Sequence, residues 1–410
     1  MNIVVQKFGG TSVRNLECQR QVMKKVLRPL RDGNKVVVVL SAMSGETNRL
    51  LDLAREWSST PDPAETDTLV STGEQVSCSL FAMLLKNQGI QARSVLGFQV
   101  PITTDGSHGR ARIMDIDADK LKGLLEEYDV LVMAGFQGCS DCGRITTLGR
   151  GGSDTSAVAL AAALEADLCE IYTDVPGVFT TDPNICSDAR KLDRIVYDEM
   201  LEMASMGAKV LQIRSVEFAK KYNVTVHVRS TFSDEPGTIV TQEDENMEAA
   251  LVSGIAYDRD QARVTLVHVI DKPGVSATIF GPLADKKILV DMIVQNPSKD
   301  GVTDMTFTVP RADLDQTVKI LDKLKYEIGY EELRSDLNVA KITIIGVGMR
   351  SHSGVASRAF RALADENVNI LMISTSEIKV TCLIDDKYTE LAVRTLHKAF
   401  QLEEEQTIRE

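Results

Sequence analysis

The sequence lacks a block of lysine and arginine residues, and acidic side chains outnumber basic ones. Of its 410 residues, 46 are Lys or Arg and 59 are Asp or Glu, which gives a formal net charge of −13 at pH 7. Proteins that bind nucleic acid usually carry a basic stripe or tail. The charge balance therefore argues against DNA or RNA as a partner.

Long apolar runs are also missing. No stretch reaches 18 uncharged apolar residues, and the N-terminal stretch "MNIVVQKFGG" has no basic segment followed by a long apolar run and a cleavage site. A membrane helix or a secretory signal needs such runs. We therefore expect a cytoplasmic location and no membrane partner.

The cysteines form no pattern of a disulfide framework. They are seven in number and widely scattered, at positions 18, 78, 139, 142, 169, 186 and 382. An odd, scattered set in a long chain fits a reducing compartment. Cys139 and Cys142 form an isolated C-x-x-C without a second pair or a histidine at metal-ligand spacing, so a hairpin turn is favoured over a metal or redox site.

The chain is long enough for two or three domains, and its first part predicts an α/β domain. Up to about residue 240, short β-branched runs alternate with longer segments of helical period. This order predicts a mainly parallel sheet between helix layers. The polar stretch "TQEDENMEA" begins a predicted linker at 241–261.

The C-terminal part contains an internal repeat. The stretch "GVSATIFGPLADKKILVDMIVQ" from Gly274 aligns with "GVASRAFRALADENVNILMIST" from Gly354 at a constant offset of 80 residues. Each copy reads strand, helix, strand, strand, helix, with a last strand expected to close it, which is the ferredoxin-like pattern. We predict two such α+β domains, at 262–337 and 338–410.

Two common nucleotide-binding motifs are absent, yet the first predicted strand ends in a phosphate-binding pattern. Neither G-x-x-x-x-G-K-[ST] nor a G-x-G-x-x-G after this strand is present. Instead, "KFGGTS" places Lys7 before Gly9 and Gly10 at a helix start. Backbone N–H groups, the helix N-terminus and a lysine together favour an anion.

Three further loops follow predicted strands or open helices. "SAMSGETN" offers Ser41 and Thr47, and "STGE" places Glu74 at a helix start, where a helix-capping role is the alternative. "GRGGSD" supplies Arg150, suited to binding a carboxylate through two hydrogen bonds, and Asp154, for which a capping role is again the alternative. The pattern suggests a polyphosphate brought beside a second anionic substrate.

These segments resemble those of a known family. "KFGGTS", "SAMSGETN", "STGEQV", "GFQG", "ITTLGRGGSDTSA", "YTDVPGVFTTDP" and "MASMGAKVL" resemble, in order, the signature segments of the aspartokinases. The resemblance covers essentially the whole chain. It implies an amino acid kinase fold at 1–240 followed by two ACT domains. It also implies phosphorylation of the L-aspartate side chain by ATP with Mg²⁺, giving 4-phospho-L-aspartate on the route to lysine, threonine and methionine.

The resemblance also implies roles for individual residues. Lys7 and Asp154 match catalytic positions, and no protein residue is assigned as a metal ligand. The residues implied to bind aspartate are Ser41, Thr47, Glu74, Arg150, Gly151, Gly152 and Ser153. Those implied to bind ATP are Lys7, Phe8, Gly9, Gly10, Thr173, Asp174, Phe179, Asp182 and Lys209.

For the repeat, the resemblance implies an amino-acid effector, lysine or threonine, held between paired ACT domains. The candidate residues are Asp271, Gly274, Ser276, Asp291 and Gln295 in the first copy and Asn369, Ser374, Thr375 and Glu377 in the second. The alternative is that the glycines only end strands and that Asp291 sits in a solvated ion pair. A homo-oligomer through ACT domains is expected.

Other readings stay open at this point. Met247 lies where some relatives start a shorter regulatory subunit, but it also fits an ordinary linker methionine. The chain as a whole also fits another acyl-phosphate-forming amino acid kinase, or an amino-acid sensor without catalysis.

Overall fold

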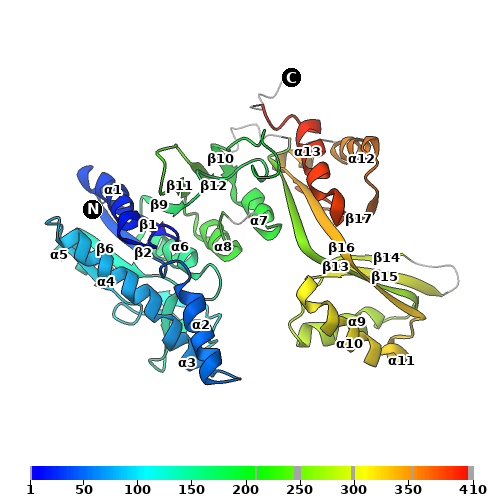
Figure 1. The fold of residues 1–410 in the computed structure, drawn as a ribbon, viewed down its shortest axis with the longest axis horizontal. Coiled ribbons are helices and arrows are strands. Elements are labelled where there is room, and N and C mark those ends of the chain that lie inside the picture. Colours follow the sequence, from blue (N-terminus) through cyan, green and yellow to red (C-terminus); the bar gives the residue numbers. More distant parts are fainter. Residues whose placement is uncertain (1, 208–209, 244–250, 297–300, 353, 405–410) are drawn as a thin grey trace. The chain divides into compact units, whose positions relative to one another are not determined.

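The computed structural model describes residues 2–207, 210–243, 251–296, 301–352 and 354–404 (Figure 1). The chain divides into two compact units. The first comprises Met1–Phe179, Lys191–Ser205 and Lys209–Met247, and the second comprises Thr180–Arg190, Met206–Ala208 and Glu248–Glu410. Lys209, Met247 and residues 244–250 of the predicted linker lie outside the described residues.

The first unit is built on a mainly parallel sheet. Within the described ranges its strand order is β10-β12-β11-β9-β1-β2-β6-β3. The strands from β11 to β3 run parallel, whereas β12 is antiparallel to β11. Their bounds are β1 Ile3–Phe8, β2 Lys35–Leu40, β3 Ala92–Val95, β6 Val130–Ala134, β9 Leu168–Thr173, β10 Arg194–Val196, β11 Val226–Ser230 and β12 Thr238–Thr241.

Helices cover both faces of this sheet, which explains why β2 is apolar along its length. On one face, α1 (Leu16–Arg31) and α4 (Thr72–Lys86) pack against side chains such as Val36 and Val38. Asn15 caps α1 by accepting a hydrogen bond from the N–H of Cys18. On the other face lies α6 (Gly152–Leu164), which is buried almost all round and is apolar from Ala157 onward.

The remaining helices of the first unit surround this core and lead to a smaller sheet. They are α2 Glu46–Trp57, α3 Pro63–Val70, α5 Ala118–Glu127, α7 Tyr197–Ser205 and α8 Ile213–Tyr222. The small sheet has the order β5-β4-β7-β8, with β4 Ile102–Thr104, β5 Ile113–Ile116, β7 Gln137–Ser140 and β8 Ile145–Thr147. The C-x-x-C stretch joins β7 to β8 as the predicted hairpin, and both of its cysteines are free.

The second unit contains a sheet whose described strands run in the order β14-β15-β13-β16-β18-β17. The strands are β13 Gly254–Ile270, β14 Asp291–Gln295, β15 Val302–Val309, β16 Glu332–Ile345, β17 Ile370–Thr375 and β18 Lys379–Asp385. The helices are α9 Val275–Asp285, α10 Leu314–Lys323, α11 Lys325–Ile328, α12 Val355–Asp365 and α13 Thr389–Ala399.

The sequence repeat is a structural repeat. Helix α9 buries Val275, Ile279 and Leu283, and α12 buries the equivalent residues 80 positions later. Two separate hydrophobic cores result, one around α9, α10 and β15 and the other around α12, α13 and β18. The prediction of two ferredoxin-like modules is therefore confirmed.

The closing strand of the second module differs from the prediction. No strand follows α13 in the part of the chain that the structure describes. Instead, Gly254–Asp258, the first part of β13, pairs with Lys341–Ile345 of β16. The later part of β13 pairs with Glu332–Asp336 and belongs to the first module. The first module is thus inserted between two strands of the second, and β13 begins within the stretch assigned to a linker.

No helix within the described ranges combines the length and apolarity needed to cross a bilayer.

Candidate active site

A cavity of about 410 Å³ opens at the carboxyl ends of β1, β2 and β9. The strand order changes direction at β1: β2 lies on one side of it, and β9, which comes later in the chain, lies on the other. Open α/β sheets bind ligands at such a switch point. The lining residues are Lys7, Gly9, Gly10, Thr11, Ser41, Ala42, Met43, Ser44, Gly45, Thr47, Glu74, Phe136, Gly149, Arg150, Gly151, Gly152, Ser153, Asp154, Ile171, Tyr172, Thr173, Val210 and Gln212.

Lys7 and Asp154 form an ion pair inside this cavity. Nζ of Lys7 lies 2.5 Å from Oδ1 of Asp154, and both side chains are about nine-tenths buried. The same carboxylate oxygen has no partner with hydrogen-bond geometry, so the contact is a charge pair rather than an aligned hydrogen bond. Asp154 does not cap α6, because the N-cap residue is Gly151. The capping alternative for Asp154 is therefore not adopted.

Gly10 lets two loops approach each other. A Cβ atom at Gly10 would lie 2.8 Å from the carbonyl oxygen of Ala42. The turn after β1 is closed by hydrogen bonds from the N–H of Ser12 to the carbonyl of Gly9 and from Val13 to Gly10. The backbone after β1 is therefore held against the loop after β2, and both line the cavity.

Glu74 reaches the cavity from the first turn of α4. Its Oε1 accepts a hydrogen bond of 3.0 Å from the backbone N–H of Ala42, while its buried Oε2 has no partner. The side chain does not cap α4, because it bonds to the loop after β2. Burial raises the pKa of Glu74 to about 7, although the bond from Ala42 opposes the shift. A buried carboxylate with a free oxygen favours a cationic ligand.

The glycines of "GRGGSD" have specific geometric roles. Gly149 and Gly151 have φ values of 78° and 71°, in the left-handed region. A Cβ atom at Gly151 would lie 2.0 Å from Cγ of Gln212. The turn therefore packs against Gln212 on one side and presents Arg150, which is exposed, to the cavity on the other. Ser153 follows in the first turn of α6.

The cavity brings together most of the residues singled out in the sequence, but not all of them. Phe8 is buried and stacks on Tyr172 with ring centroids 4.6 Å apart, beneath the cavity. Asp174 is exposed and accepts a hydrogen bond from the Thr173 hydroxyl, whereas Phe179 pairs with Lys191 in a β-bridge. Asp182 belongs to the second unit. Neither Phe8, Asp174, Phe179 nor Asp182 lines the cavity, and Lys209 lies outside the described residues.

Several residues that line the cavity were not identified as site residues by the sequence analysis. Gln212, Phe136, Gly149 and Tyr172 contribute from elements far apart in the chain. Gly149 could have been identified from the sequence, because it belongs to the same glycine-rich stretch as Arg150. No local pattern distinguishes Gln212, whose role depends on its contact with Gly151.

Comparisons with known proteins identify the family. The chain matches the amino acid kinase family over residues 2–230 and ACT domains over residues 263–327 and 342–400. It is 55% identical over 404 residues to an aspartate kinase of Stutzerimonas stutzeri, with 98% of each chain covered. It is also 55% identical over 405 residues to an aspartokinase of Pseudomonas aeruginosa, again with 98% of each covered. The chain belongs to the aspartate kinase family.

Solved structures agree with this assignment. The kinase is similar to aspartokinase III of Escherichia coli in complex with aspartate and ADP, with a TM-score of 0.81 and 30% identity over 97% of this chain and 99% of that one. The same relative in complex with lysine and aspartate gives a TM-score of 0.74 at 31% identity, with the same coverage. The predicted family, fold class and kinase activity are confirmed, and the enzyme belongs to amino-acid biosynthesis.

The candidate effector residues of the kinase lie around the edge strands of the second unit's sheet. Asp291 and Gln295 are on β14, and Ser374 and Thr375 are on β17. Asp291 is exposed but forms an ion pair, because its Oδ2 lies 2.5 Å from Nζ of Lys341, a fully buried lysine on β16. Burial raises the pKa of Asp291, whereas the hydrogen bond and the charge of Lys341 lower it. The pKa of Asp291 is lowered overall.

The other candidate effector residues lie at the start of α9, just before β17 and between β17 and β18. Gly274 and Gly354 are the N-cap residues of α9 and α12, with φ values of 92° and 103°. The remaining candidates, all exposed, are Asp271, Ser276, Asn369 and Glu377.

Proposed function

We propose that this kinase transfers the γ-phosphoryl group of ATP to the side-chain carboxylate of L-aspartate, giving 4-phospho-L-aspartate and ADP. The observation that carries the proposal is the single cavity in which Lys7, Asp154, Glu74 and Arg150 converge. One anion-binding turn with a lysine suits a phosphate, and a separate arginine with a buried carboxylate suits an amino acid. The E. coli relative, solved with aspartate and ADP, supports the same pair of ligands.

Each group has a defined task in this proposal. Arg150 binds the α-carboxylate of aspartate with its planar guanidinium, and Glu74 accepts hydrogen bonds from the α-ammonium through its free Oε2. Ser41, Thr47 and Ser153 supply hydroxyls along the cavity wall. Gly9, Gly10 and Thr173 line the nucleotide side of the cavity. On the family resemblance alone, we propose that Phe8, Asp174, Phe179, Asp182 and Lys209 also take part in ATP binding.

The chemical step requires little base catalysis, because the attacking carboxylate is already ionised at neutral pH. One aspartate side-chain oxygen forms a bond to the γ-phosphorus while the bond from that phosphorus to the β–γ bridging oxygen breaks. Lys7 neutralises charge on the transferring group and reduces its repulsion from the attacking carboxylate. Asp154 holds Lys7 in the cavity before the substrates enter.

Mg²⁺ is expected to enter with the phosphates. Within the described ranges no group of three or more His, Cys, Asp or Glu side chains forms a metal cage. Mg²⁺ in kinases is held by one or two carboxylates, substrate phosphates and water. Asp154 would supply this carboxylate from the cavity wall, whereas in this structure its Oδ1 pairs with Lys7. When bound, the ion would offset negative charge on the phosphates.

Regulation is proposed to reside in the ACT modules. E. coli aspartokinase III has been solved with lysine in a T-state, and we propose that lysine, threonine or both bind near the edge strands of the present sheet. Such a ligand inhibits only if it binds the inactive state more tightly. The exposed edges also favour a homo-oligomer paired through ACT domains, with a shorter subunit starting near Met247 as a further component. We place the enzyme in the cytoplasm, where ATP is available.

The test is ATP-dependent hydroxamate formation from L-aspartate, measured without effector, with lysine, with threonine and with both. Activity with aspartate but not with glutamate or acetylglutamate supports the substrate assignment. A fall in rate only when both effectors are present would indicate concerted control, whereas a fall with one alone would identify that effector. Absence of product with aspartate in every condition would refute the proposed function.

A further inference from the structure

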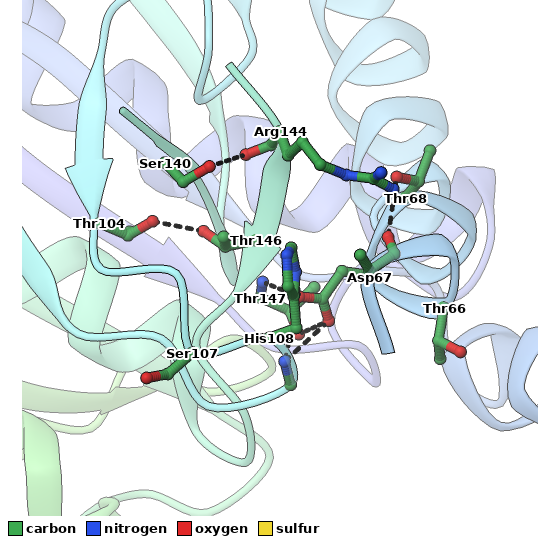
Figure 2. A network of polar contacts seen from close by, with 12 residues as sticks. Thr66, Asp67, Thr68, Thr104, Ser107, His108, Ser140, Arg144, Thr146 and Thr147 are labelled. Atoms are coloured by element: carbon green, nitrogen blue, oxygen red, sulfur yellow. Dashed lines mark hydrogen bonds and ion pairs between the residues drawn. The ribbon is translucent and has the colours of Figure 1, made fainter. Parts of the chain in front are cut away.

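A buried carboxylate outside the cavity joins the end of β8 to the loop before β5, next to the turn that carries Arg150. Asp67 lies on α3, and its side chain is 2% exposed. Figure 2 shows the side chains of His108 and Thr147 directed toward this carboxylate. None of the roles described above uses Asp67.

The carboxylate of Asp67 accepts hydrogen bonds from three residues. The Thr147 hydroxyl donates over 2.6 Å and the Thr147 backbone N–H over 3.1 Å. The backbone N–H of Gly109 lies 3.1 and 3.0 Å from the two oxygens, and Nδ1 of His108 lies 2.8 Å from Oδ2. Both oxygens are therefore occupied, and every partner comes from the end of β8 or from the loop before β5 rather than from α3.

These partners lead directly to Arg150. Thr147 ends β8, three residues before the arginine, and its carbonyl accepts a hydrogen bond of 2.8 Å from the N–H of Ala111. Gly109 packs against the turn itself, because a Cβ atom at Gly149 would lie 3.0 Å from the Gly109 carbonyl oxygen. Asp67 thus fixes both the strand that enters the turn and the loop that lies against it.

A second clamp acts on the same segment from another helix. Arg214 on α8 donates to the carbonyl of Leu148 and, over 3.0 Å, to the carbonyl of Ala111. The residues immediately before Arg150 are therefore held by a buried anion on one side and a guanidinium on the other. Arg150 itself is exposed, so its direction depends on the backbone that carries it.

We propose that Asp67 is a positioning residue for aspartate binding: it holds the 147–151 turn so that Arg150 meets the α-carboxylate of the substrate. The inference rests on the proposed role of Arg150. A carboxylate suits this task because both of its oxygens accept hydrogen bonds, whereas an asparagine would turn an N–H₂ group toward one set of donors. A misplacement of about 1 Å at a binding group is enough to cost up to about a hundredfold in rate.

The test compares steady-state kinetics of five variants with the parent enzyme. For Asp67→Asn we expect the KM for aspartate to rise at least about tenfold, with a smaller change in kcat and an unchanged KM for ATP. Thr147→Val, which removes only the hydroxyl donor, raises the KM for aspartate in the same way. Thr147→Ser, which keeps the hydroxyl donor, has the KM for aspartate of the parent enzyme. This rescue distinguishes positioning from a general loss of packing.

Glu65→Gln is the matched control. Glu65 lies on the same helix and makes an exposed ion pair of 2.7 Å with Arg144, just before β8. Exposed pairs contribute little, so this change of carboxylate to amide leaves both KM values unchanged. The Thr147 pair keeps the proposal testable if Asp67→Asn fails to fold, which circular dichroism would reveal.

Arg150→Lys separates the two proposals. If this variant leaves the KM for aspartate unchanged, the role of Arg150 is wrong and the inference fails with it. If Arg150→Lys raises the KM for aspartate but Thr147→Val does not, Arg150 binds the substrate and the positioning role of Asp67 is refuted. Equal increases in the KM values for aspartate and ATP in the Thr147→Val enzyme would also overturn it, because they would indicate a general distortion.

Discussion

At the scale of single residues, the role of Glu74 is set by its burial rather than by its position in the first turn of a helix. A glutamate in the first turn of a helix is usually a solvated cap, but this side chain is 3% exposed and bonds to the loop after β2. Burial raises its pKa to about 7. The free enzyme therefore changes charge at this residue within the physiological range.

This shift predicts a pH dependence for aspartate binding. Only ionised Glu74 attracts the substrate ammonium, so kcat/KM for aspartate should fall below pH ~7, approaching tenfold per pH unit. Above that pH it should level off. In Glu74→Gln, kcat/KM should be low throughout, and the acid limb near pH 7 should disappear. An acid limb of the same midpoint in the variant would assign the titration to another group.

Lys7 gives the second prediction at this scale. Because Lys7 is proposed to act on the transferring phosphoryl group, Lys7→Ala should lower kcat by at least about a hundredfold while changing the KM for aspartate much less. Steady-state rates with each substrate varied in turn would measure this split. A variant with normal kcat and a raised KM for aspartate would instead place Lys7 at the amino-acid site.

Single residues also show where sequence reasoning succeeds and stops. Lys7, Glu74, Arg150 and Asp154 lie at strand ends or helix starts, which made them candidates, and the family resemblance assigned them to one site. All four line the same cavity. Asp67 sits in "PAETDTLV", where a solvated helix face is the natural interpretation. Its importance comes from partners 41 and 80 residues away, which no local pattern reveals.

At the scale of elements, the same distinction applies to the repeat. The offset of 80 residues predicted the helices correctly, because α9 and α12 bury equivalent positions against their own strands. The closing strand of the second module was misplaced after α13. Periodicity indicates that a segment is a strand. It does not indicate the partner, because the pairing of Asp258 with Lys341 joins segments far apart in the chain and depends on non-local packing.

The turn around Arg150 gives a prediction at the element scale. Gly151→Ala adds a methyl group 2.0 Å from Cγ of Gln212 at a φ of 71°. Either the turn or Gln212 must move, so the KM for aspartate should rise by about tenfold or more. Gly33→Ala is the control, because it has a similar φ of 83° but nothing within 4 Å. Both variants should lose about 1 kcal/mol of stability from backbone strain, and only the first should lose aspartate affinity.

At the scale of the whole molecule, the chain passes from one unit to the other in the middle of a predicted nucleotide loop. Thr180–Arg190, which includes the last residues of that loop, belongs to the second unit. There the carbonyl of Thr180 accepts from the N–H of Ile255, and its hydroxyl lies 2.9 Å from Nε2 of His397. Asp182 accepts a hydrogen bond from the Tyr257 hydroxyl. The second module thus contacts Thr180 and Asp182, which lie at the end of a stretch that we propose to bind ATP.

His397 makes the stability of the second unit depend on pH. Burial lowers its pKa, so the folded state keeps a neutral imidazole while the unfolded chain binds a proton near pH 6.5. The unfolded state therefore holds more protons below pH ~6.5, and stability falls as the pH decreases through that range, by at most about 1.4 kcal/mol per unit. Above pH ~6.5 both states are neutral and the effect is absent.

The prediction is checked by urea denaturation of the whole enzyme at fixed protein concentration, at several values between pH 5.5 and pH 8. Relative to His397→Gln, the parent enzyme should lose stability as the pH falls, because the variant has no imidazole to protonate. His268→Gln is the control of opposite sign: a hydrogen bond from exposed His268 to Glu331 raises the histidine pKa, so its stabilisation is present at low pH and lost as the pH rises. A pH-independent difference between parent and His397→Gln would show that the Thr180 contact does not require a neutral imidazole.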